Sequence, residues 1–356
     1  MAEKNAKCLI YGAYGYTGKL IVDLCVKHSF DVVIAGRNPG KVNKMAEETG
    51  FESLIFGLDD STALSKILEP FSVVLHCAGP FMFTAKPMMK ACIESKTHYL
   101  DITGEIQVFE LAASLDETLR KANICAIPGV GFDVVPSDCM AAFVKKLLPD
   151  AESLELAIYT KGGVSRGTSL TMIENIEKGG AVRRNHKITK VPAAWRVKEF
   201  TFGDITKPAV TIPWGDVSTA WHSTNIPNID VYMSLPRKAI KMNSMMRYFG
   251  FLFKINWLKS FLRKKVSSEV TGPDDNARKT GETRILATAT NSAGKKAEAL
   301  LQGPEGYTLT ALTAFEAMKR VLYNPPKAGF HTPSKAFGED FILAFDGVKR
   351  TVVTEP

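Results

Sequence analysis

Three glycines near the N-terminus are the clearest chemical signal in this sequence. Gly12, Gly15 and Gly18 form the pattern GxxGxxG directly after the apolar run 8–11. Glycines at this spacing make a tight turn, let backbone approach a phosphate and let a helix pack closely on a strand. A helix that starts there offers free N–H groups to a pyrophosphate. The pattern predicts a dinucleotide-binding loop, and an ordinary turn between a strand and a helix is the alternative.

The residues after the second predicted strand favour NADP(H) over NAD(H). A site for NAD usually has an acidic residue here, which binds the ribose 2′-hydroxyl and would repel a 2′-phosphate. This chain instead has Arg37, with Lys41 four residues later. A guanidinium can form paired hydrogen bonds with a phosphate, and an ammonium adds a second positive charge. We therefore predict NADP(H) as the cofactor.

A further cofactor contact is predicted at the turn 78–80. The turn follows the apolar strand 71–77, and the carboxyl ends of parallel strands face the ligand crevice in dinucleotide-binding folds. An ordinary turn is again the alternative. The predicted cofactor-binding residues are Gly12, Tyr14, Gly15, Tyr16, Thr17, Gly18, Arg37, Asn38, Lys41, Ala78, Gly79 and Pro80.

Acidic and phenolic side chains follow two later strands and could supply a proton. Tyr99 and Asp101 lie in the strand 98–102, and Asp133 lies in a loop after the strand 124–127. A carboxyl buried beside the crevice would have a raised pKa and could act as an acid. We predict Tyr99, Asp101 and Asp133 as catalytic residues. The alternative is that Asp101 and Asp133 accept hydrogen bonds from loop N–H groups.

Alternating strands and helices position these residues. Strands are predicted at 8–11, 31–35, 52–56, 71–77, 98–102 and 124–127. Helices are predicted between them at 16–27, 41–49, 61–68 and 87–95, with another that ends at 121. This alternation predicts a doubly wound parallel sheet of Rossmann type with strand order 3-2-1-4-5-6.

The pattern changes after about residue 150. The stretch 153–160 alternates apolar and polar residues, and 282–291 and 295–302 read as a hairpin across a short turn. These features predict an α+β second domain with an antiparallel sheet. A helix is expected at 306–322 and a loop at 330–338.

Two stretches of the second half could bind a partner. The stretch 178–198 is strongly basic, and we interpret it either as a docking surface for an anionic group or as a solvated face. The stretch 245–265 is predicted to be an exposed amphipathic helix that ends in three basic residues, Arg263, Lys264 and Lys265. A core helix or a dimer helix is the alternative.

Composition is that of an ordinary soluble globular protein. The 356 residues are 45% hydrophobic and 23% charged, and the net charge of +8 suits an anionic partner. No motif supports nucleic-acid binding. The six cysteines have no metal-ligand spacing, so we expect reduced cysteines, no metal and a cytoplasmic location. The polar N-terminus does not resemble a signal peptide, and no apolar run is long enough to span a membrane.

Several stretches together resemble the saccharopine dehydrogenase-like oxidoreductases, and within them the branch of trans-acting enoyl reductases. The resemblance spans nearly the whole chain and is loose only between about 180 and 300. It is carried by the segments YGAYGYTG (11–18), AGR (35–37), CAGPF (77–81), HYLDITGE (98–105), PGVGFDVVPSD (128–138), SRGT (165–168), PEGYTLTA (304–311) and TPSKAFG (332–338).

The resemblance implies an NADP-binding Rossmann domain at 1–137, a substrate or oligomerisation domain at 138–305, and C-terminal helices at 306–356 that return to the first domain. It implies an NADP-dependent oxidoreductase, and the basic and apolar insert favours an enoyl or carbonyl group on a lipid-like or carrier-bound substrate. An acyl carrier, a membrane surface and a second subunit are the candidate partners. Two alternatives are an NADP(H)-binding protein without turnover that acts through a partner or a lipid surface, and a saccharopine-type reductase acting on amino acids.

Overall fold

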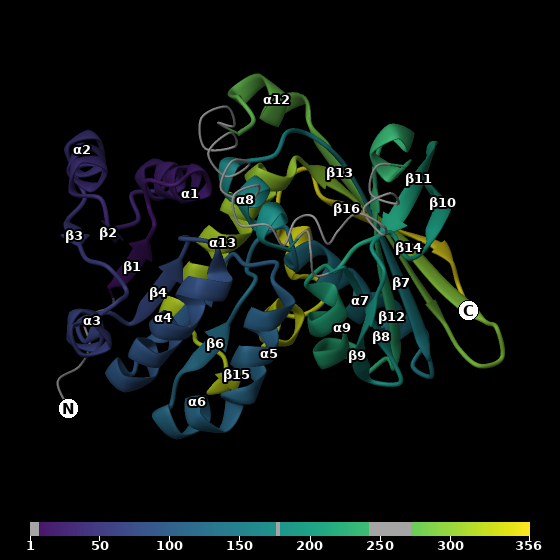
Figure 1. Ribbon diagram of the computed structural model, residues 1–356, viewed down its shortest axis with the longest axis horizontal. Coiled ribbons are helices and arrows are strands. Elements are labelled where there is room, and N and C mark those ends of the chain that lie inside the picture. The colour runs from purple at the N-terminus through teal and green to yellow at the C-terminus, as the bar shows by residue number, and fades with distance from the viewer. Residues whose placement is uncertain (1–6, 176–178, 242–271) are drawn as a thin grey trace. The chain divides into compact units, whose positions relative to one another are not determined.

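We describe a computed structural model of the chain, which covers residues 7–175, 179–241 and 272–356. The chain forms two compact units, and each is built from two separate segments. The first unit contains residues 1–135 and 307–337, and the second contains 136–306 and 338–356. Figure 1 shows the elements of both units. The predicted stretch 245–265 lies outside the described residues.

The first unit is built on a parallel sheet of seven strands in the order β15-β6-β5-β4-β1-β2-β3. This confirms the predicted order 3-2-1-4-5-6 and adds one edge strand. The strands are β1 (Cys8–Tyr11), β2 (Val33–Gly36), β3 (Ser53–Ile55), β4 (Val73–His76), β5 (His98–Asp101), β6 (Cys125–Ile127) and β15 (Gly329–Phe330).

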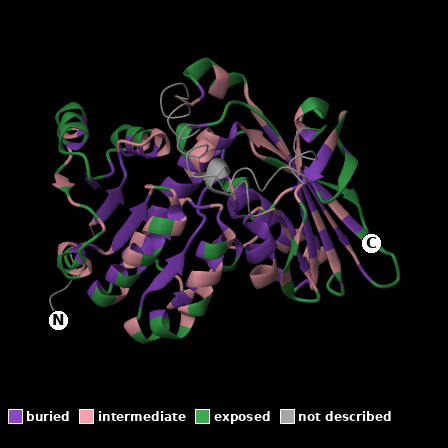
Figure 2. Ribbon diagram, in the orientation of Figure 1, coloured by how far each residue is buried: buried purple, intermediate pink, exposed green. Residues whose placement is uncertain are grey.

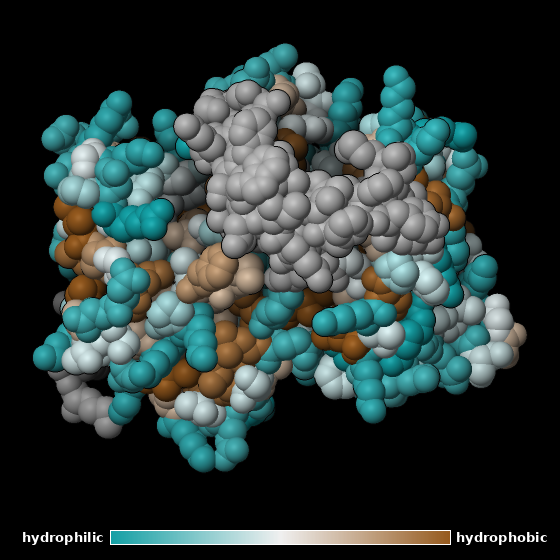
Figure 3. All heavy atoms as spheres, in the orientation of Figure 1, coloured by the Kyte–Doolittle hydropathy of each residue, from teal (hydrophilic) through white to brown (hydrophobic). Residues whose placement is uncertain are grey.

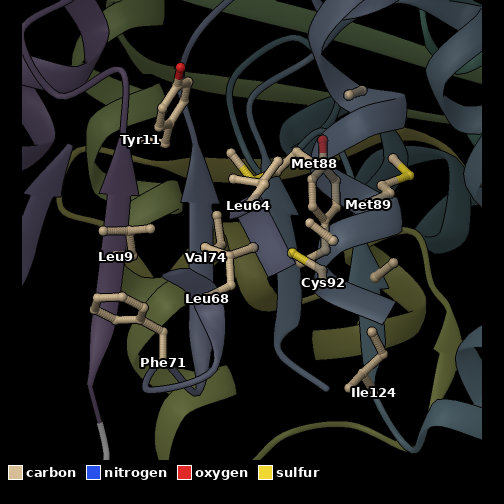
Figure 4. Packing of buried hydrophobic residues seen from close by; sticks show 14 of the residues in the cluster. Leu9, Tyr11, Leu64, Leu68, Phe71, Val74, Met88, Met89, Cys92 and Ile124 are labelled. Carbon is tan, nitrogen blue, oxygen red and sulfur yellow. The ribbon is translucent and has the colours of Figure 1, made fainter. Parts of the chain in front are cut away.

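Helices connect these strands and cover the sheet. They are α1 (Tyr16–Lys27), α2 (Pro39–Thr49), α3 (Ser61–Leu68), α4 (Phe81–Ser95), α5 (Ile106–Ser114), α6 (Asp116–Ala122), α13 (Gly306–Tyr323) and α14 (Pro333–Phe337). Leu64 and Leu68 of α3 and Met88 and Met89 of α4 belong to one buried hydrophobic cluster with Leu9 of β1 (Figure 4). Strands β1, β2 and β4 are buried from end to end, and exposed residues lie on the outer faces of the helices (Figure 2). This core holds the carboxyl ends of the strands, and hence the candidate site, in fixed register.

Two predictions for the first unit are wrong at the level of single elements. Helix α4 begins at Phe81, six residues before the expected start at Pro87. Glu105 accepts hydrogen bonds from the first two N–H groups of this helix, and Pro87 is accommodated within it. The expected loop 330–338 contains helix α14 and the end of strand β15, which pairs with β6 through residues distant in sequence.

The second unit is built on a sheet of nine strands. The sheet is mainly antiparallel, as predicted for an α+β domain. Its main path is β10-β11-β12-β7-β13-β14-β16, and β8 joins β12 to β9. Only the pairing of β12 with β7 is parallel among these strands of the described chain. The strands are β7 (Ser153–Lys161), β8 (Gly180–Arg184), β9 (Lys187–Val191), β10 (Val197–Phe202), β11 (Ile205–Thr211), β12 (Asn228–Ser234), β13 (Glu282–Thr290), β14 (Lys296–Pro304) and β16 (Lys349–Thr354).

The described helices of this unit are α7 (Val135–Leu147), α8 (Arg166–Asn175), α9 (Asp216–Thr224), α12 (Asp275–Thr280) and the short 3-10 helix η2 (Phe341–Ala344). The predicted hairpin is formed by β13 and β14, and its register places Thr290 opposite Lys296. Residues 338–356 group with this unit, and β16 pairs with β14. We expected all of 306–356 to return to the first unit. Only residues 307–337 do so.

Part of the basic stretch 178–198 has partners within the second unit. Arg184 and Arg196 both pair with Asp230, and Lys198 pairs with Glu155. Arg183 is buried against the ring of Trp221. These side chains fix the hairpin of β8 and β9 and its neighbours, so much of the predicted anion-docking charge has a structural partner.

None of the six cysteines forms a disulfide, and five of them are buried. No helix in the described part of the chain combines the length and the apolarity that crossing a bilayer requires. Within the same described ranges, no three His, Cys, Asp or Glu side chains are grouped closely enough to hold a metal ion.

Candidate functional site

Gly12 and Gly18 shape the glycine loop because no other residue fits at either position. Gly12 has φ +81°, and a Cβ there would come within 2.9 Å of the Cβ of Ala78. A Cβ at Gly18 would come within 2.4 Å of the carbonyl oxygen of Gly12. The loop is thereby folded against the start of helix α1 on one side and the turn after β4 on the other.

Gly15 is half-buried, between the glycine loop and helix α1. A Cβ there would meet only the carbonyl oxygen of Gly12, at 3.1 Å. Gly15 is the N-cap of α1, has no side chain to cap the helix, and no acidic residue lies in the first turn. The positive end of the helix dipole is therefore open to an anion, which is the environment that a pyrophosphate requires. Tyr16 and Thr17 form the first turn of the same helix.

Tyr14, Arg37 and Lys41 gather beside the end of β2. A Cβ at Gly36 would come within 2.4 Å of the ring of Tyr14, so the ring lies directly against the strand end. The ammonium of Lys41 lies 5.6 Å from the centre of that ring. Arg37 is exposed and has no carboxylate partner among the described residues. An unpaired guanidinium and an ammonium beside an aromatic ring can bind a ribose phosphate.

Asn38 has a structural role at the same place. Its side-chain oxygen accepts a hydrogen bond from the Lys41 N–H at 3.0 Å and caps helix α2. This cap fixes the position at which Lys41 leaves the backbone. The predicted cofactor residues of this part of the chain thus lie at one edge of the sheet, where β1 and β2 end.

The turn Ala78-Gly79-Pro80 lies beside the glycine loop, since Gly12 packs against Ala78. On its far side, the two carboxylate oxygens of Glu105 accept hydrogen bonds from the N–H groups of Phe81 and Met82, each at 2.8 Å. Both contacts support the turn from within the first unit. Its predicted role in cofactor binding stays a prediction.

Asp101 is fully buried and ties two loops together. One carboxylate oxygen accepts hydrogen bonds from the N–H groups of Thr103 at 2.9 Å and Gly129 at 2.8 Å, and the other accepts the Tyr99 hydroxyl at 2.6 Å. Burial raises the pKa of Asp101 to about 6, and these hydrogen bonds oppose the rise. Burial, followed by the Asp101 charge, raises the pKa of Tyr99 well above its usual value. This geometry matches the alternative in which Asp101 holds loop N–H groups.

Asp133 differs from Asp101 because it is half-buried and has no hydrogen-bond partner among the described residues. A Cβ at Gly104 would come within 2.7 Å of its carboxylate oxygen, so the absence of a side chain at Gly104 makes room for it. Burial, followed by repulsion from Glu105, raises the pKa of Asp133 to about 7. Of the three predicted catalytic side chains, Asp133 is the one that solvent or a substrate can reach.

Two threonines of helix α13 support the loop that carries Asp133, and neither is among the predicted site residues. Thr310 accepts a hydrogen bond from the Phe132 N–H at 3.0 Å, and Thr313 donates one to the Val130 carbonyl at 2.8 Å. The two partners are separated by nearly 180 residues in sequence, so no local pattern relates them. Glu105 follows strand β5 in the sequence, and its contact with α4 also depends on tertiary structure.

Comparison with known proteins identifies a cofactor-binding domain in the first part of the chain. Residues 8–127 match the family model of the saccharopine dehydrogenase NADP binding domain. The match lies within the first domain of this chain, and NADP is the cofactor that it indicates. The resemblance noted in the sequence is confirmed for this part of the chain.

Three curated relatives match parts of the chain. A mouse saccharopine dehydrogenase-like oxidoreductase is 29% identical over 150 residues, which cover 36% of this chain and 35% of that protein. A Caenorhabditis elegans lipid droplet localized protein is 24% identical over 245 residues, which cover 59% and 57%. A Mycobacterium tuberculosis protein named as a candidate trans-acting enoyl reductase is 28% identical over 186 residues, which cover 47% and 43%. The chain thus matches between about a third and somewhat over half of the length of these relatives.

A solved structure shows the same fold over the whole chain. Saccharopine dehydrogenase (L-Glu forming) of Saccharomyces cerevisiae superposes with a TM-score of 0.67 and 14% identity, covering 98% of this chain and all of that one. The predicted combination of a Rossmann domain and a second domain with a mainly antiparallel sheet is confirmed.

Proposed function

Because its first domain contains the match to the saccharopine dehydrogenase NADP binding domain, we propose that this protein is an NADP(H)-dependent oxidoreductase. The substrate that we propose is an enoyl or carbonyl group on a lipid-like or carrier-bound molecule. The observation that carries the proposal is the glycine loop with the unpaired Arg37 beside it, at the edge of the sheet where Asp133 also lies.

The residues of this edge fit the cofactor. The open start of α1 at Gly15 suits the pyrophosphate, and Arg37 with Lys41 suits the 2′-phosphate. The turn 78–80 would contact the nicotinamide half. NADPH supplies a hydride when it is bound there. The side chains of the chain itself must then orient the substrate, exclude water and provide a proton.

Asp133 is the proton donor that we propose. Reduction of a C=C or C=O bond needs a proton for the atom that does not receive the hydride. A carboxyl group whose pKa is raised to about 7 holds that proton near neutral pH and can release it. Tyr99 and Asp101 are too deeply buried to reach a substrate, so we assign them to holding the loops after β5 and β6.

An apolar side chain supports the lipid-like substrate class. Phe83, in the first turn of α4, is 60% exposed although it is a large hydrophobic residue. In Figure 3, apolar residues reach the visible surface over α4 among the hydrophilic residues around them. An exposed ring that follows the cofactor turn can contact an acyl chain. The lipid droplet name of the C. elegans relative agrees with such a substrate, and we propose a peripheral location at a lipid surface for this protein.

The test is oxidation of NADPH by the purified full chain with enoyl-CoA thioesters, aldehydes and ketones of short and long chain. We expect stoichiometric loss of NADPH and formation of the reduced product with a long-chain member of the set. Saccharopine with NADP⁺ tests the alternative of an amino-acid reductase. Flotation with liposomes that contain anionic lipid tests the peripheral location.

A second candidate function is an NADP(H)-binding protein without turnover. The observation that favours it is that Asp133 is the only accessible acid among the three predicted catalytic residues. NADPH binding without oxidation for every substrate of the set would favour this candidate and contradict the enzyme.

A further inference from the structure

A buried histidine lies beneath the cofactor turn and has no assigned role. His76 ends strand β4 and is fully buried against the rings of Tyr11, Phe81 and Tyr99. Its Nε2 lies 2.9 Å from the hydroxyl oxygen of Thr84, near the start of helix α4. Its Nδ1 is buried and has no hydrogen-bond partner among the described residues.

The hydrogen bonds around Thr84 define the tautomer of His76. The Thr84 hydroxyl has a single proton, and it donates this proton to the Ala78 carbonyl at 2.7 Å, with the Pro80 carbonyl further away at 3.3 Å. The same oxygen must therefore accept from the imidazole, so the proton of His76 is on Nε2. Burial lowers the pKa of His76 to about 3, and the ring stays neutral at physiological pH.

This arrangement connects the core of the domain to the carbonyl of Ala78. Two hydrogen bonds, which we call the relay, join the His76 imidazole to the Thr84 hydroxyl and this hydroxyl to the Ala78 carbonyl. Ala78 is the residue against which Gly12 packs. Glu105 holds the other end of the turn through the N–H groups of Phe81 and Met82. The turn 78–80 is thus fixed at both of its ends, by the Thr84 hydroxyl at one and by Glu105 at the other.

The unpartnered Nδ1 indicates that a histidine at this position lowers the stability of the fold. A buried acceptor without a partner lowers stability, whereas a phenylalanine or leucine would fill an aromatic pocket without that cost. The hydrogen bond from Nε2–H to Thr84 is what an apolar residue could not supply. We therefore interpret His76 as the residue that orients the Thr84 hydroxyl, and not only as a packing residue.

We propose that His76 and Thr84 are positioning residues for the nicotinamide half of NADP(H). They hold the Ala78 carbonyl, and with it the turn 78–80, against the glycine loop. The proposal rests on the role in cofactor binding that we propose for this turn. The 2′-phosphate half is bound elsewhere, at Arg37 and Lys41, and does not depend on the relay.

The test compares two ligands in each variant by calorimetric titration of the full chain. NADPH contains both halves, whereas 2′,5′-ADP contains the phosphate-bearing half and no nicotinamide. In Thr84→Val we expect the Kd of NADPH to rise about five- to ten-fold and the Kd of 2′,5′-ADP to stay within about two-fold, in line with loss of one or two hydrogen bonds. Thr84→Ser should restore wild-type affinity. His76→Phe should reproduce the Thr84→Val result.

Thr49→Val is the matched control. Its hydroxyl donates to the Met45 carbonyl at 2.7 Å at the C-terminal end of α2, away from the turn. It should change neither affinity. Equal weakening of both ligands in Thr84→Val would mean a general loss of stability and would overturn the proposal, as would no change in either. If the wild type binds no NADPH, the proposed function itself is wrong, so the two failures can be told apart.

Discussion

Asp133 gives the sharpest test of the candidate site, because its titration can be measured without knowing the substrate. Burial and the charge of Glu105 raise the pKa of this carboxyl to about 7. The chain labelled with ¹³C at aspartate carboxyl carbons should show one resonance with a midpoint near neutral pH that is absent from Asp133→Asn. Glu105→Gln should move that midpoint to lower pH, because a repelling charge has been removed.

The same shift predicts how stability depends on pH. A pKa raised from 3.8 to about 7 disfavours the ionised folded state by at most about 4 kcal/mol. The carboxyl is half-buried and reaches solvent, so we expect about 1–2 kcal/mol. The sign follows from proton linkage: the folded state binds the proton more tightly than the unfolded state, so wild-type stability is full below about pH 4 and falls as the pH rises through 7.

Denaturant unfolding of wild type and Asp133→Asn between pH 4 and 8.5 measures this effect. The asparagine variant should gain about 1–2 kcal/mol relative to wild type across that range. Asp31→Asn, at an exposed position of the same domain, controls for the substitution itself. A resonance midpoint below about pH 5, or a stability difference that does not change with pH, would refute the assignment of Asp133 as the proton donor.

Three further predictions concern the cofactor edge. Arg37→Ala should weaken NADPH binding about ten-fold or more and leave NADH binding nearly unchanged, because charge-assisted hydrogen bonds to the 2′-phosphate are lost. Lys44→Ala, in the helix α2 that follows Arg37, is the control in fluorescence titrations. Equal losses for both cofactors would contradict the role of Arg37. Gly15→Val should abolish NADPH binding with an unchanged circular dichroism spectrum. Gly18→Ala should instead lower the denaturation midpoint, because its Cβ would come within 2.4 Å of the Gly12 carbonyl oxygen. A Gly18→Ala variant as stable as wild type would show that the loop geometry is wrong. Phe83→Ser should raise KM several-fold for a long-chain substrate and little for a short-chain one, and equal changes would remove Phe83 from the substrate site.

The arrangement of the first domain was predictable because its signals are local. Each strand is a short apolar run, and glycine turns such as the one at Gly12 follow the strands at regular spacing. The rule that parallel strands are joined by right-handed crossovers then leaves few possible orders. Arg37 could be placed for the same reason, since the role proposed for it follows from its position after the second strand.

The features that were not predictable depend on residues far apart in the chain. Pro87 suggested the start of a helix, but Glu105 supplies the hydrogen bonds that let α4 begin at Phe81. Asp101 and Asp133 looked equivalent in the sequence, and only their tertiary contacts separate a loop clamp from an accessible carboxyl. The stretch 245–265 lies outside the described residues, so its membrane interpretation stays a prediction.

The discontinuity of the first unit has a consequence for synthesis of the protein. Its cofactor edge is completed by α13 and β15, which the ribosome makes after about 170 residues of the second unit. At about 5–20 residues per second, Thr310 and Thr313 emerge roughly 10–35 s after the loop that they hold. During that interval the Asp133 loop lacks its support and the β6 edge lacks its neighbouring strand, so the nascent chain cannot complete its cofactor edge. An expressed fragment that stops near residue 135 would stay in that incomplete state.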